Sequence, residues 1–166
     1  AVGELASGLS GAGRMEEPEN IFQLIKSFLA EKEPKLAGKK VLVTAGPTFE
    51  AIDPVRYIGN YSSGLMGFSI AEEFADRGAD VTLVAGPVHL AKTNSSIKQL
   101  DVTSAEEMHR SCLAESNADI IVMAAAVADF KPASVSGTKI KKSDTLSEIK
   151  LVSTSDILSD LGKSKK

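Results

Sequence analysis

The chain has 166 residues, of which 43% are hydrophobic and 25% are charged, and its formal net charge at pH 7 is −3. This length and composition are typical of one globular domain with a real core. The negative net charge argues against a nucleic-acid-binding surface, which needs a concentrated basic face. A short basic cluster, residues 138–142, still leaves room for a single anionic ligand.

The single cysteine, Cys112, excludes a disulfide framework. No apolar run approaches the ~18 residues that a membrane span requires. The first residues also lack the basic-then-apolar pattern of a signal peptide. We therefore expect a cytoplasmic protein with no membrane partner and no nucleic-acid partner.

The first twenty residues are rich in glycine and small side chains, which predicts a mobile arm. A helix is predicted over residues 16–33, because apolar residues recur there with helical spacing. These residues are Ile21, Leu24, Ile25, Phe28 and Leu29. A linker follows, so we expect the domain proper to span residues 39–166 and to be preceded by a separate segment, residues 1–38.

From residue 39 onwards, apolar strands alternate with amphipathic helices. We expect strands at 40–45, 80–86, 97–102 and 119–126, and helices at 62–78, 104–116 and 153–162. This alternation predicts an α/β fold, a Rossmann-like three-layer αβα sandwich with a mainly parallel sheet. The sheet would end on a helix with no strand to follow, so we expect it to be incomplete at the C-terminus.

Several helix ends carry capping signals. Ser104 and Glu107 form a capping-box pattern, and Gly78 suits a helix C-terminus. The other N-caps are expected at Ser62 or Ser63 and at Thr154 or Ser155. Within the helix at 62–78, the side chains expected on one inward face are Met66, Ile70 and Phe74. Beyond the last strand, residues 139–142 and 148–152 are expected to pair as a short excursion.

Ligands of open α/β sheets bind beyond the carboxyl ends of the strands, near the point where the strand order reverses. Two polar loops, 46–62 and 125–138, are predicted at that edge. The first loop is neither a G-x-G-x-x-G fingerprint nor a Walker loop. It leads into Ser62, Ser63 and Gly64 at a helix start, which predicts either an anion site at the positive end of the helix dipole or simple capping.

Four further side chains in these loops have two interpretations each. Arg56 is either a solvated charge or a fork for a carboxylate or phosphate. Asn60 either adopts a left-handed turn or donates its amide to an oxyanion. Asp129 either forms a turn or holds a ribose hydroxyl or a metal. Lys139 either belongs to a solvated face or reaches across to phosphates.

The two histidines, His89 and His109, have no partners at metal-ligand spacing. A zinc site is therefore not expected, and no metal ligand is assigned.

Three segments, "TAGPTFEAIDPVRYIGNYSSGLMG", "AAAVADFKP" and "KIKK", together resemble bacterial phosphopantothenoylcysteine synthetases. These enzymes are the ligase half of the bifunctional flavoproteins of coenzyme A biosynthesis, and the resemblance covers about residues 39–166. Residues 1–38 resemble the tail of the decarboxylase half, followed by a linker helix. The FMN-binding body of that half is absent from this sequence. The family's tail cysteine is missing too, with Ser7 and Ser10 in that segment, so decarboxylation is not expected.

The resemblance implies ligation of 4'-phosphopantothenate and L-cysteine, driven by CTP through an acyl-cytidylate. It also implies magnesium on the phosphates and a homodimer. The catalytic residues that it implies are Asn60 for the acyl-cytidylate, Lys139 for the phosphate charge, and Arg56. The nucleotide-binding positions that it implies are Gly46, Pro47, Thr48, Ser62, Ser63, Gly64, Ala125, Ala126, Asp129 and Lys139.

Two alternatives remain open. An NAD(P)-dependent oxidoreductase on a similar sheet is disfavoured, because the G-x-G-x-x-G loop is missing and no acidic residue closes the strand at 80–86. An inactive nucleotide-binding or dimerising fragment is the other alternative. The family continues with a further strand, a glycine-phenylalanine motif and a lysine-asparagine-rich loop, and none of these occurs before Lys166.

Overall fold

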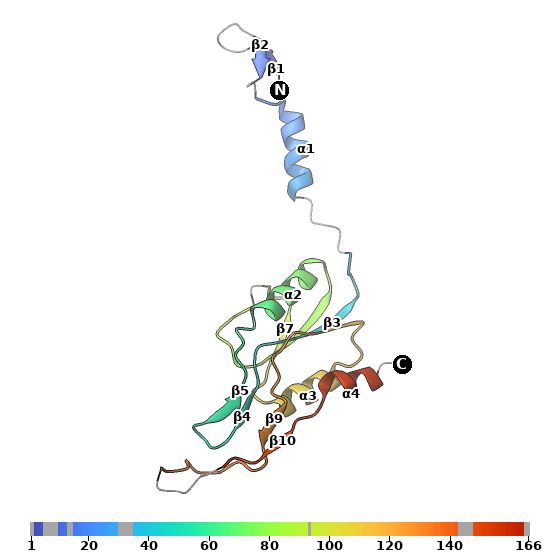
Figure 1. The fold of residues 1–166 in the computed structure, drawn as a ribbon. Helices are drawn as coiled ribbons and strands as arrows, with labels where there is room; N and C mark the ends of the chain where they lie inside the picture. The colour runs from blue at the N-terminus through green and yellow to red at the C-terminus, as the bar shows by residue number, and fades with distance from the viewer. Residues whose placement is uncertain are drawn as a thin grey trace. The chain divides into compact units, whose positions relative to one another are not determined.

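The fold is that of a computed structural model, which describes residues 2–4, 10–12, 15–29, 35–92, 94–142 and 148–164. The chain divides into two compact units, residues 1–33 and 34–166 (Figure 1). The first unit holds strands β1 (Val2–Glu4) and β2 (Ser10–Ala12), which pair antiparallel, and helix α1 (Pro18–Leu29). The helix was predicted, whereas the hairpin lies where a mobile arm was expected. The end of the predicted helix, 30–33, lies outside the described residues.

The second unit is built on a four-stranded parallel sheet. Its strands are β3 (Lys40–Ala45), β6 (Asp80–Ala85), β7 (Lys98–Asp101) and β8 (Ile120–Met123). Their order across the sheet is β7-β6-β3-β8. The helices of this unit are α2 (Leu65–Asp76), α3 (Ala105–Ala114) and α4 (Ile157–Ser164). The predicted α/β class with a parallel sheet is confirmed.

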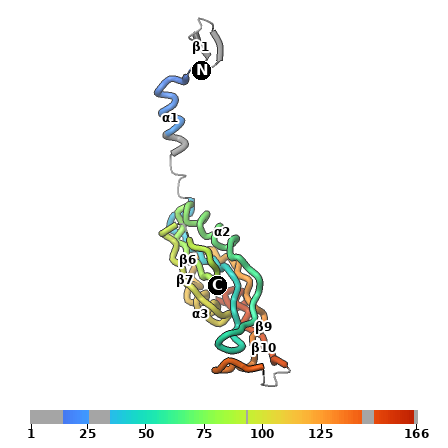
Figure 2. The backbone as a smooth tube through the Cα atoms, turned by 90° about the vertical axis from the view of Figure 1, so that its left-hand side faces the viewer, coloured from blue at the N-terminus to red at the C-terminus, as the bar shows by residue number. Residues whose placement is uncertain are grey.

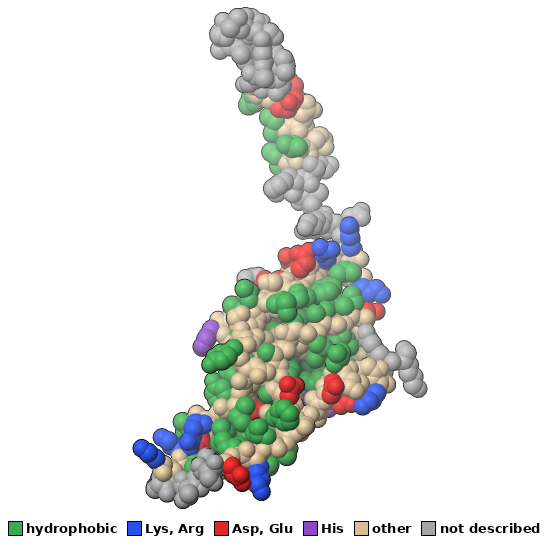
Figure 3. Space-filling view, viewed as in Figure 1, with side chains coloured by type: hydrophobic (Ala, Val, Ile, Leu, Met, Phe, Trp, Pro, Cys, Tyr) green, Lys and Arg blue, Asp and Glu red, His purple; other side chains and the backbone are tan. Residues whose placement is uncertain are grey.

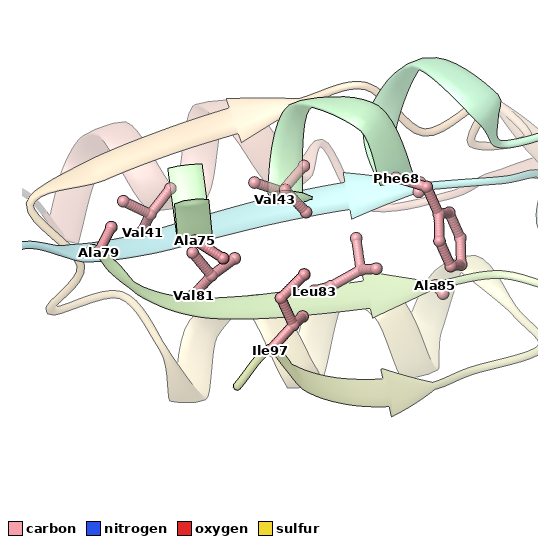
Figure 4. Packing of buried hydrophobic residues seen from close by; sticks show 11 residues of the cluster. Val41, Val43, Phe68, Ala75, Ala79, Val81, Leu83, Ala85 and Ile97 are labelled. Atoms are coloured by element: carbon pink, nitrogen blue, oxygen red, sulfur yellow. The ribbon is translucent and has the colours of Figure 1, made fainter. Parts of the chain in front are cut away.

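Alternating residues of the central strands pack on opposite faces of the sheet. Val41, Val43 and Leu83 belong to the cluster that packs under α2, where Phe68 reaches Ala85 (Figure 4). On the other face, the cluster that includes Leu42 and Val84 continues into residues of α3 and α4, namely Met108, Cys112, Ile157 and Leu161. Helices therefore cover both faces, as a three-layer sandwich requires.

Helix α2 lies very close to β3 because of Gly67. A Cβ atom at this position would lie 2.6 Å from the Ala45 Cβ and 2.7 Å from the Thr44 carbonyl oxygen. The buried face of α2 is therefore turned from the predicted one. Met66 is 64% exposed, while Ile70 and Phe74 are partly buried at the margin of the cluster.

The capping predictions have mixed outcomes. The capping box of Ser104 and Glu107 is confirmed, and Gly78 follows α2 with a φ of 85°. No serine caps α2. Its N-cap is Gly64, because Ser62 Oγ and Ser63 Oγ accept hydrogen bonds from backbone N–H groups only two residues further on.

Helix α4 also starts later than predicted. Asp156 Oδ1 accepts a hydrogen bond from Ser159 N at 2.9 Å, so the cap is Asp156 and not Thr154 or Ser155. The Thr154 hydroxyl instead donates to Ala128 O at 2.7 Å.

The predicted pairing of 139–142 with 148–152 is wrong. Strand β10 (Leu151–Ser153) pairs antiparallel with β9 (Phe130–Pro132) instead. The segment between these strands, residues 133–150, is called the excursion below, and the turn expected within it at 143–146 lies outside the described residues. A second unpredicted hairpin, β4 (Phe49–Ala51) with β5 (Tyr57–Gly59), occupies the long loop after β3.

Candidate functional site

The strand order reverses between β3 and β8. The chain passes from β3 to β6 and β7 on one side and then returns to place β8 on the other side of β3. The loops that follow β3 and β8, residues 46–64 and 124–129, therefore start from neighbouring strand ends. We call them the braced loops. This is the edge at which ligands of such sheets bind.

Backbone groups tie the braced loops to each other. Ala126 N donates to Gly46 O at 2.8 Å, and Thr48 N donates to Ala126 O at 3.3 Å. Pro47 and Ala126 form an isolated parallel bridge. The sheet pairing thus continues past the strands, and Ala126 is fixed beside the turn at 46–48.

Two buried threonine hydroxyls complete the bracing. Thr44 Oγ1 accepts from Ala124 N and Ala125 N at 3.1 Å each, and Thr48 Oγ1 accepts from Ala128 N at 3.0 Å. Strand β8 therefore ends at Met123, three residues before the predicted end. The N–H groups of Ala124 and Ala125 bond to a side chain and not to a neighbouring strand.

The turn at 46–48 depends on glycines with no room for a side chain. Gly46 has a φ of 78°, which side-chain-bearing residues rarely adopt. A Cβ atom at Gly86 would lie 1.7 Å from the Pro47 carbonyl oxygen. The first turn of the braced loops therefore rests directly on the end of β6.

The start of α2 packs against the same turn. Gly64 is buried with a φ of 77°, and a Cβ atom there would lie 3.1 Å from Val88 Cγ1 and 3.4 Å from Gly46 N. The predicted anion-binding positions 46–48 and 62–64 are thus brought together. Leu65 N, the first N–H group of α2, donates to Ser63 Oγ at 3.4 Å, so a ligand at this edge would meet the N–H groups that follow it in the first turn.

Asn60 braces the second loop. Its Nδ2 donates to Ala126 O at 3.3 Å and to Val127 O at 2.9 Å. The left-handed alternative is wrong, since no residue other than glycine has a positive φ in the described part of the chain. The amide N–H groups of Asn60 are committed to protein carbonyls, and its Oδ1 is the atom left to meet a ligand.

Arg56 is paired rather than solvated. Its guanidinium bonds to Asp53, through Nε at 3.0 Å from Oδ2 and through Nη2. The Asp53 side chain is fully buried and also accepts from Val55 N at 2.8 Å and Arg56 N at 2.9 Å. The Arg56 guanidinium holds the pKa of the Asp53 carboxyl well below its usual range. The sequence interpretation missed Asp53, although an aspartate before a proline is a turn signal.

The pair of Asp53 and Arg56 also holds the excursion. Arg56 Nη2 donates to Ile140 O at 2.8 Å, and Ile140 N donates to Asp53 Oδ2 at 3.1 Å. Lys139 is thereby fixed next to the β4–β5 hairpin, with an exposed side chain. Figures 1 and 2 both draw the hairpin beside the excursion, and Figure 3 shows Lys and Arg side chains gathered at this end of the molecule.

Two hollows flank the braced loops. The first, of about 320 Å³, lies between the end of β8 and the start of α4, and its lining includes Ala125 and Asp129. The second, of about 360 Å³, is lined by Pro47, Asn60 and Ser62 together with aromatic rings. Two of these rings, Phe49 and Tyr57, stack with centroids 3.9 Å apart. The predicted nucleotide-binding residues therefore fall into two neighbouring groups.

No metal centre is built into the described residues, since no group of three or more His, Cys, Asp or Glu side chains among them could hold an ion. His109 Nε2 lies 3.0 Å from Asp160 Oδ2 and links α3 to α4. Burial raises the pKa of Cys112 to about 12, which excludes it as a nucleophile. Within the same described residues, no helix has the length and apolar character to cross a membrane.

Residues 36–166 match the family described as the DNA/pantothenate metabolism flavoprotein C-terminal domain. The chain belongs to this family. The resemblance to the synthetase half of the bifunctional flavoproteins is thereby confirmed.

Two curated relatives show how much of a longer protein this family member spans. The chain is 51% identical to the coenzyme A biosynthesis bifunctional protein CoaBC of Haemophilus influenzae, over 95% of this chain and 39% of the relative. It is 50% identical to a cysteine/cysteine sulfinic acid decarboxylase from an unknown prokaryotic organism, over 99% of this chain and 47% of the relative. The chain thus spans less than half the length of these two proteins.

Solved structures agree with the family. The C-terminal domain of a CoaBC protein superposes with a TM-score of 0.69 at 40% identity, covering 81% of this chain and 63% of that chain. A Cab2 mutant in complex with phosphopantothenate-cysteine shares the fold, with a TM-score of 0.64 at 19% identity, covering 90% of this chain and 68% of that chain.

Proposed function

We propose that this chain catalyses the CTP-dependent joining of 4'-phosphopantothenate and L-cysteine in coenzyme A biosynthesis. Family membership and the CoaBC relatives support the pathway, and the phosphopantothenate-cysteine bound to the Cab2 neighbour supports the substrates. The observation that carries the proposal is the meeting of the braced loops at the reversal of strand order, with the residue next to Lys139 bonded to the β4–β5 hairpin. An oxidoreductase would need the glycine fingerprint that this edge lacks.

The turn at 46–48 and the start of α2 are proposed to bind the phosphates of CTP. The start of α2 contributes the N–H groups of its first turn and the positive end of its dipole. The turn at 46–48 packs against it, with the Thr48 N–H bonded to Ala126 O and no N–H on Pro47. Because Gly46 and Gly64 approach each other closely, the turn at 46–48 and the start of α2 form one continuous surface. A fixed backbone surface of this kind suits anions because it needs no reorganisation when charge develops on the phosphates.

The hollow at the end of β8 is proposed to hold the nucleoside, because Ala125 and Asp129 line it and the intervening Ala126 is bonded to Gly46 and Thr48 of the phosphate surface. Magnesium fits this arrangement when it arrives with the triphosphate, since Mg²⁺ is usually held by one or two carboxylates together with substrate phosphates. Asp129 is the carboxylate that would hold it here, and the ion would neutralise phosphate charge.

The reaction has two steps. A carboxylate oxygen of 4'-phosphopantothenate attacks the α-phosphorus of CTP, an oxygen–phosphorus bond forms, and the bond to pyrophosphate breaks. The amine of cysteine then attacks the acyl carbon, CMP leaves with the bonding electrons, and the amine loses a proton. Lys139 would neutralise charge on the phosphates in the first step, and Asn60 Oδ1 would face the acyl-cytidylate. Positioning and charge neutralisation supply the catalysis.

A homodimer and a cytoplasmic location belong to the same proposal. Large exposed apolar side chains on the hairpin, including Val55 and Tyr57, supply surface for a partner.

Pyrophosphate release tests the proposal. The chain is incubated with magnesium, CTP and 4'-phosphopantothenate, before and after cysteine is added. We expect release that requires phosphopantothenate and that prefers CTP to ATP or UTP. Nucleotide binding without release would identify a non-catalytic fragment, and an absence of nucleotide binding would contradict the phosphate surface itself. When Asn60→Asp is assayed in the same way, Asn117→Asp serves as its matched control, because Asn117 is an exposed amide at the amino-terminal edge of the sheet.

A further inference from the structure

Asp53 is a fully buried carboxylate in which both oxygens accept several hydrogen bonds. Oδ1 accepts from Val55 N and Arg56 N, and Oδ2 accepts from Arg56 Nε, Arg56 Nη2 and Ile140 N. A buried charge is tolerated only when it is paired and hydrogen-bonded in this way. Asp53 therefore requires its partners to stay in place.

One of these partners is far away in the sequence. Ile140 lies 87 residues after Asp53, and both of its backbone polar groups are held, with the N–H on Asp53 Oδ2 and the carbonyl on Arg56 Nη2. The Ile140 N–H belongs to the peptide unit that it shares with the Lys139 carbonyl. The backbone of Lys139 is thereby fixed on its C-terminal side.

The same hairpin holds the excursion at a second point, where Ser136 N donates to Ile52 O at 3.0 Å. Between these two attachments the chain is exposed, and no hydrogen bond or ion pair joins the Lys139 ammonium to another of the described residues. Lysine carries its charge on a flexible four-carbon stem. When the backbone of such a lysine is fixed, its ammonium samples a smaller volume. This favours a single orientation of the side chain toward a ligand.

We propose that Asp53 is a positioning residue for Lys139. Its buried carboxylate acts through Arg56 and the backbone of Ile140 to set the point from which Lys139 reaches the reacting phosphates. This inference rests on the proposed function for the role of Lys139, but the attachment itself can be measured without turnover. If Asp53 were purely structural, it would stabilise the turn at 52–56, and its substitution would not change the contribution of Lys139 to catalysis.

The first experiment follows amide hydrogen exchange in the 166-residue chain. Asp53→Asn removes the charge and keeps the shape, so we expect the Ile140 amide to exchange at least tenfold faster. The amide of Ala126, which bonds to Gly46 O, should stay unchanged. Glu73→Gln, which breaks the exposed Arg77–Glu73 ion pair on α2, is the matched control and should change neither amide. Unchanged exchange at Ile140 would overturn the proposal.

The second experiment is a double-mutant cycle on pyrophosphate release. We expect Asp53→Asn to lower kcat about tenfold with less than a threefold change in the KM for CTP. In a Lys139→Gln background the same substitution should lower kcat less than twofold. Equal losses in both backgrounds would show that Asp53 acts independently of Lys139, which refutes the positioning role.

If Asp53→Asn fails to fold, a second variant, Arg56→Lys, tests the same proposal. Arg56→Lys keeps the positive charge beside Asp53 but removes the fork that reaches Ile140 O. It should raise exchange at Ile140 and show the same dependence on Lys139. If no variant, including the parent chain, releases pyrophosphate, the proposed function fails. The exchange at Ile140 still decides whether Asp53 holds the excursion.

Discussion

The braced loops and the excursion differ in how their backbones are attached. In the braced loops, N–H and carbonyl groups of Gly46, Thr48 and Ala126 continue the sheet pairing, and buried hydroxyls hold the residues between them. In the described part of the excursion, the backbone is attached at separate points: Ala133 N donates to Lys150 O, and Ser136 and Ile140 bond to the β4–β5 hairpin. A surface that binds phosphates needs a fixed backbone, whereas a lysine that approaches them needs a fixed base and a free end.

Gly86→Ala would break the braced loops most severely. The new Cβ would overlap the Pro47 carbonyl oxygen, so the turn at 46–48 must move, and we expect a loss of about 3 kcal/mol in the free energy of unfolding. Urea denaturation measures the loss. Gly162→Ala, in α4 with nothing within 4 Å, should instead stabilise by up to about 1 kcal/mol. Equal effects of the two alanines would contradict the close approach.

Lys139→Gln should act on rate and not on stability. We expect pyrophosphate release to slow about a hundredfold, equivalent to ~2.7 kcal/mol in the barrier, with an unchanged unfolding midpoint. The reason is that the side chain is exposed and the backbone contacts of Ile140 remain. Lys142→Gln, three residues on and also exposed, is the control and should change the rate less than twofold. A destabilised Lys139→Gln would favour a structural role.

Asn60→Asp should moderately lower both the free energy of unfolding and the amount of acyl-cytidylate formed. A carboxylate in place of the amide would face the carbonyls of Ala126 and Val127 without a donor, so we expect a loss of roughly 1.5 kcal/mol in unfolding free energy. Because the side chain would lose its fixed position beside these carbonyls, trapped acyl-cytidylate should fall about tenfold. Chromatography of quenched reactions measures this amount. Normal amounts of the intermediate would remove Asn60 from the mechanism.

Thr44→Val should be the mildest test of the bracing. It removes the acceptor for Ala124 N and Ala125 N while it keeps the shape of a β-branched side chain, and we expect a loss of about 1 kcal/mol. Thr82→Val, on neighbouring β6 and nearly as buried, is the control and should be close to neutral. The two variants are compared by thermal unfolding, and a larger loss at Thr82 would contradict the assigned role of the Thr44 hydroxyl.

The sheet and its helices could be predicted because their signals are local. The predicted strand at 40–45 matches β3 residue for residue, the one at 80–86 exceeds β6 by one residue, and the capping box at Ser104 marks the start of α3. The end of β8 could not be predicted, because it depends on a hydroxyl of Thr44 that is eighty residues away in the sequence. The rotation of α2 depends in the same way on the contact between Gly67 and Ala45.

For the candidate site, the sequence predicted that two loops share one edge of the sheet, but not how their residues are connected. The loops at 46–64 and 124–129 meet as the parallel topology requires. Asp53 and Glu50 were missed, because a buried acid in a polar loop resembles a solvated one until its partners are known. Glu50 Oε1 accepts from Ala105 N at 2.8 Å, and this contact joins the hairpin to the start of α3. The roles assigned to Asn60, Arg56 and Lys139 stay predictions.

The burial of Cys112 has a practical consequence for watching the excursion. This residue is the only cysteine in the sequence, and its raised pKa keeps it protonated at neutral pH, where alkylating reagents attack thiolates. The native chain is therefore already a background without a reactive thiol. A cysteine introduced at an exposed position such as Lys142 would take up a maleimide fluorophore selectively, and its anisotropy would report the motion of the excursion as nucleotide binds.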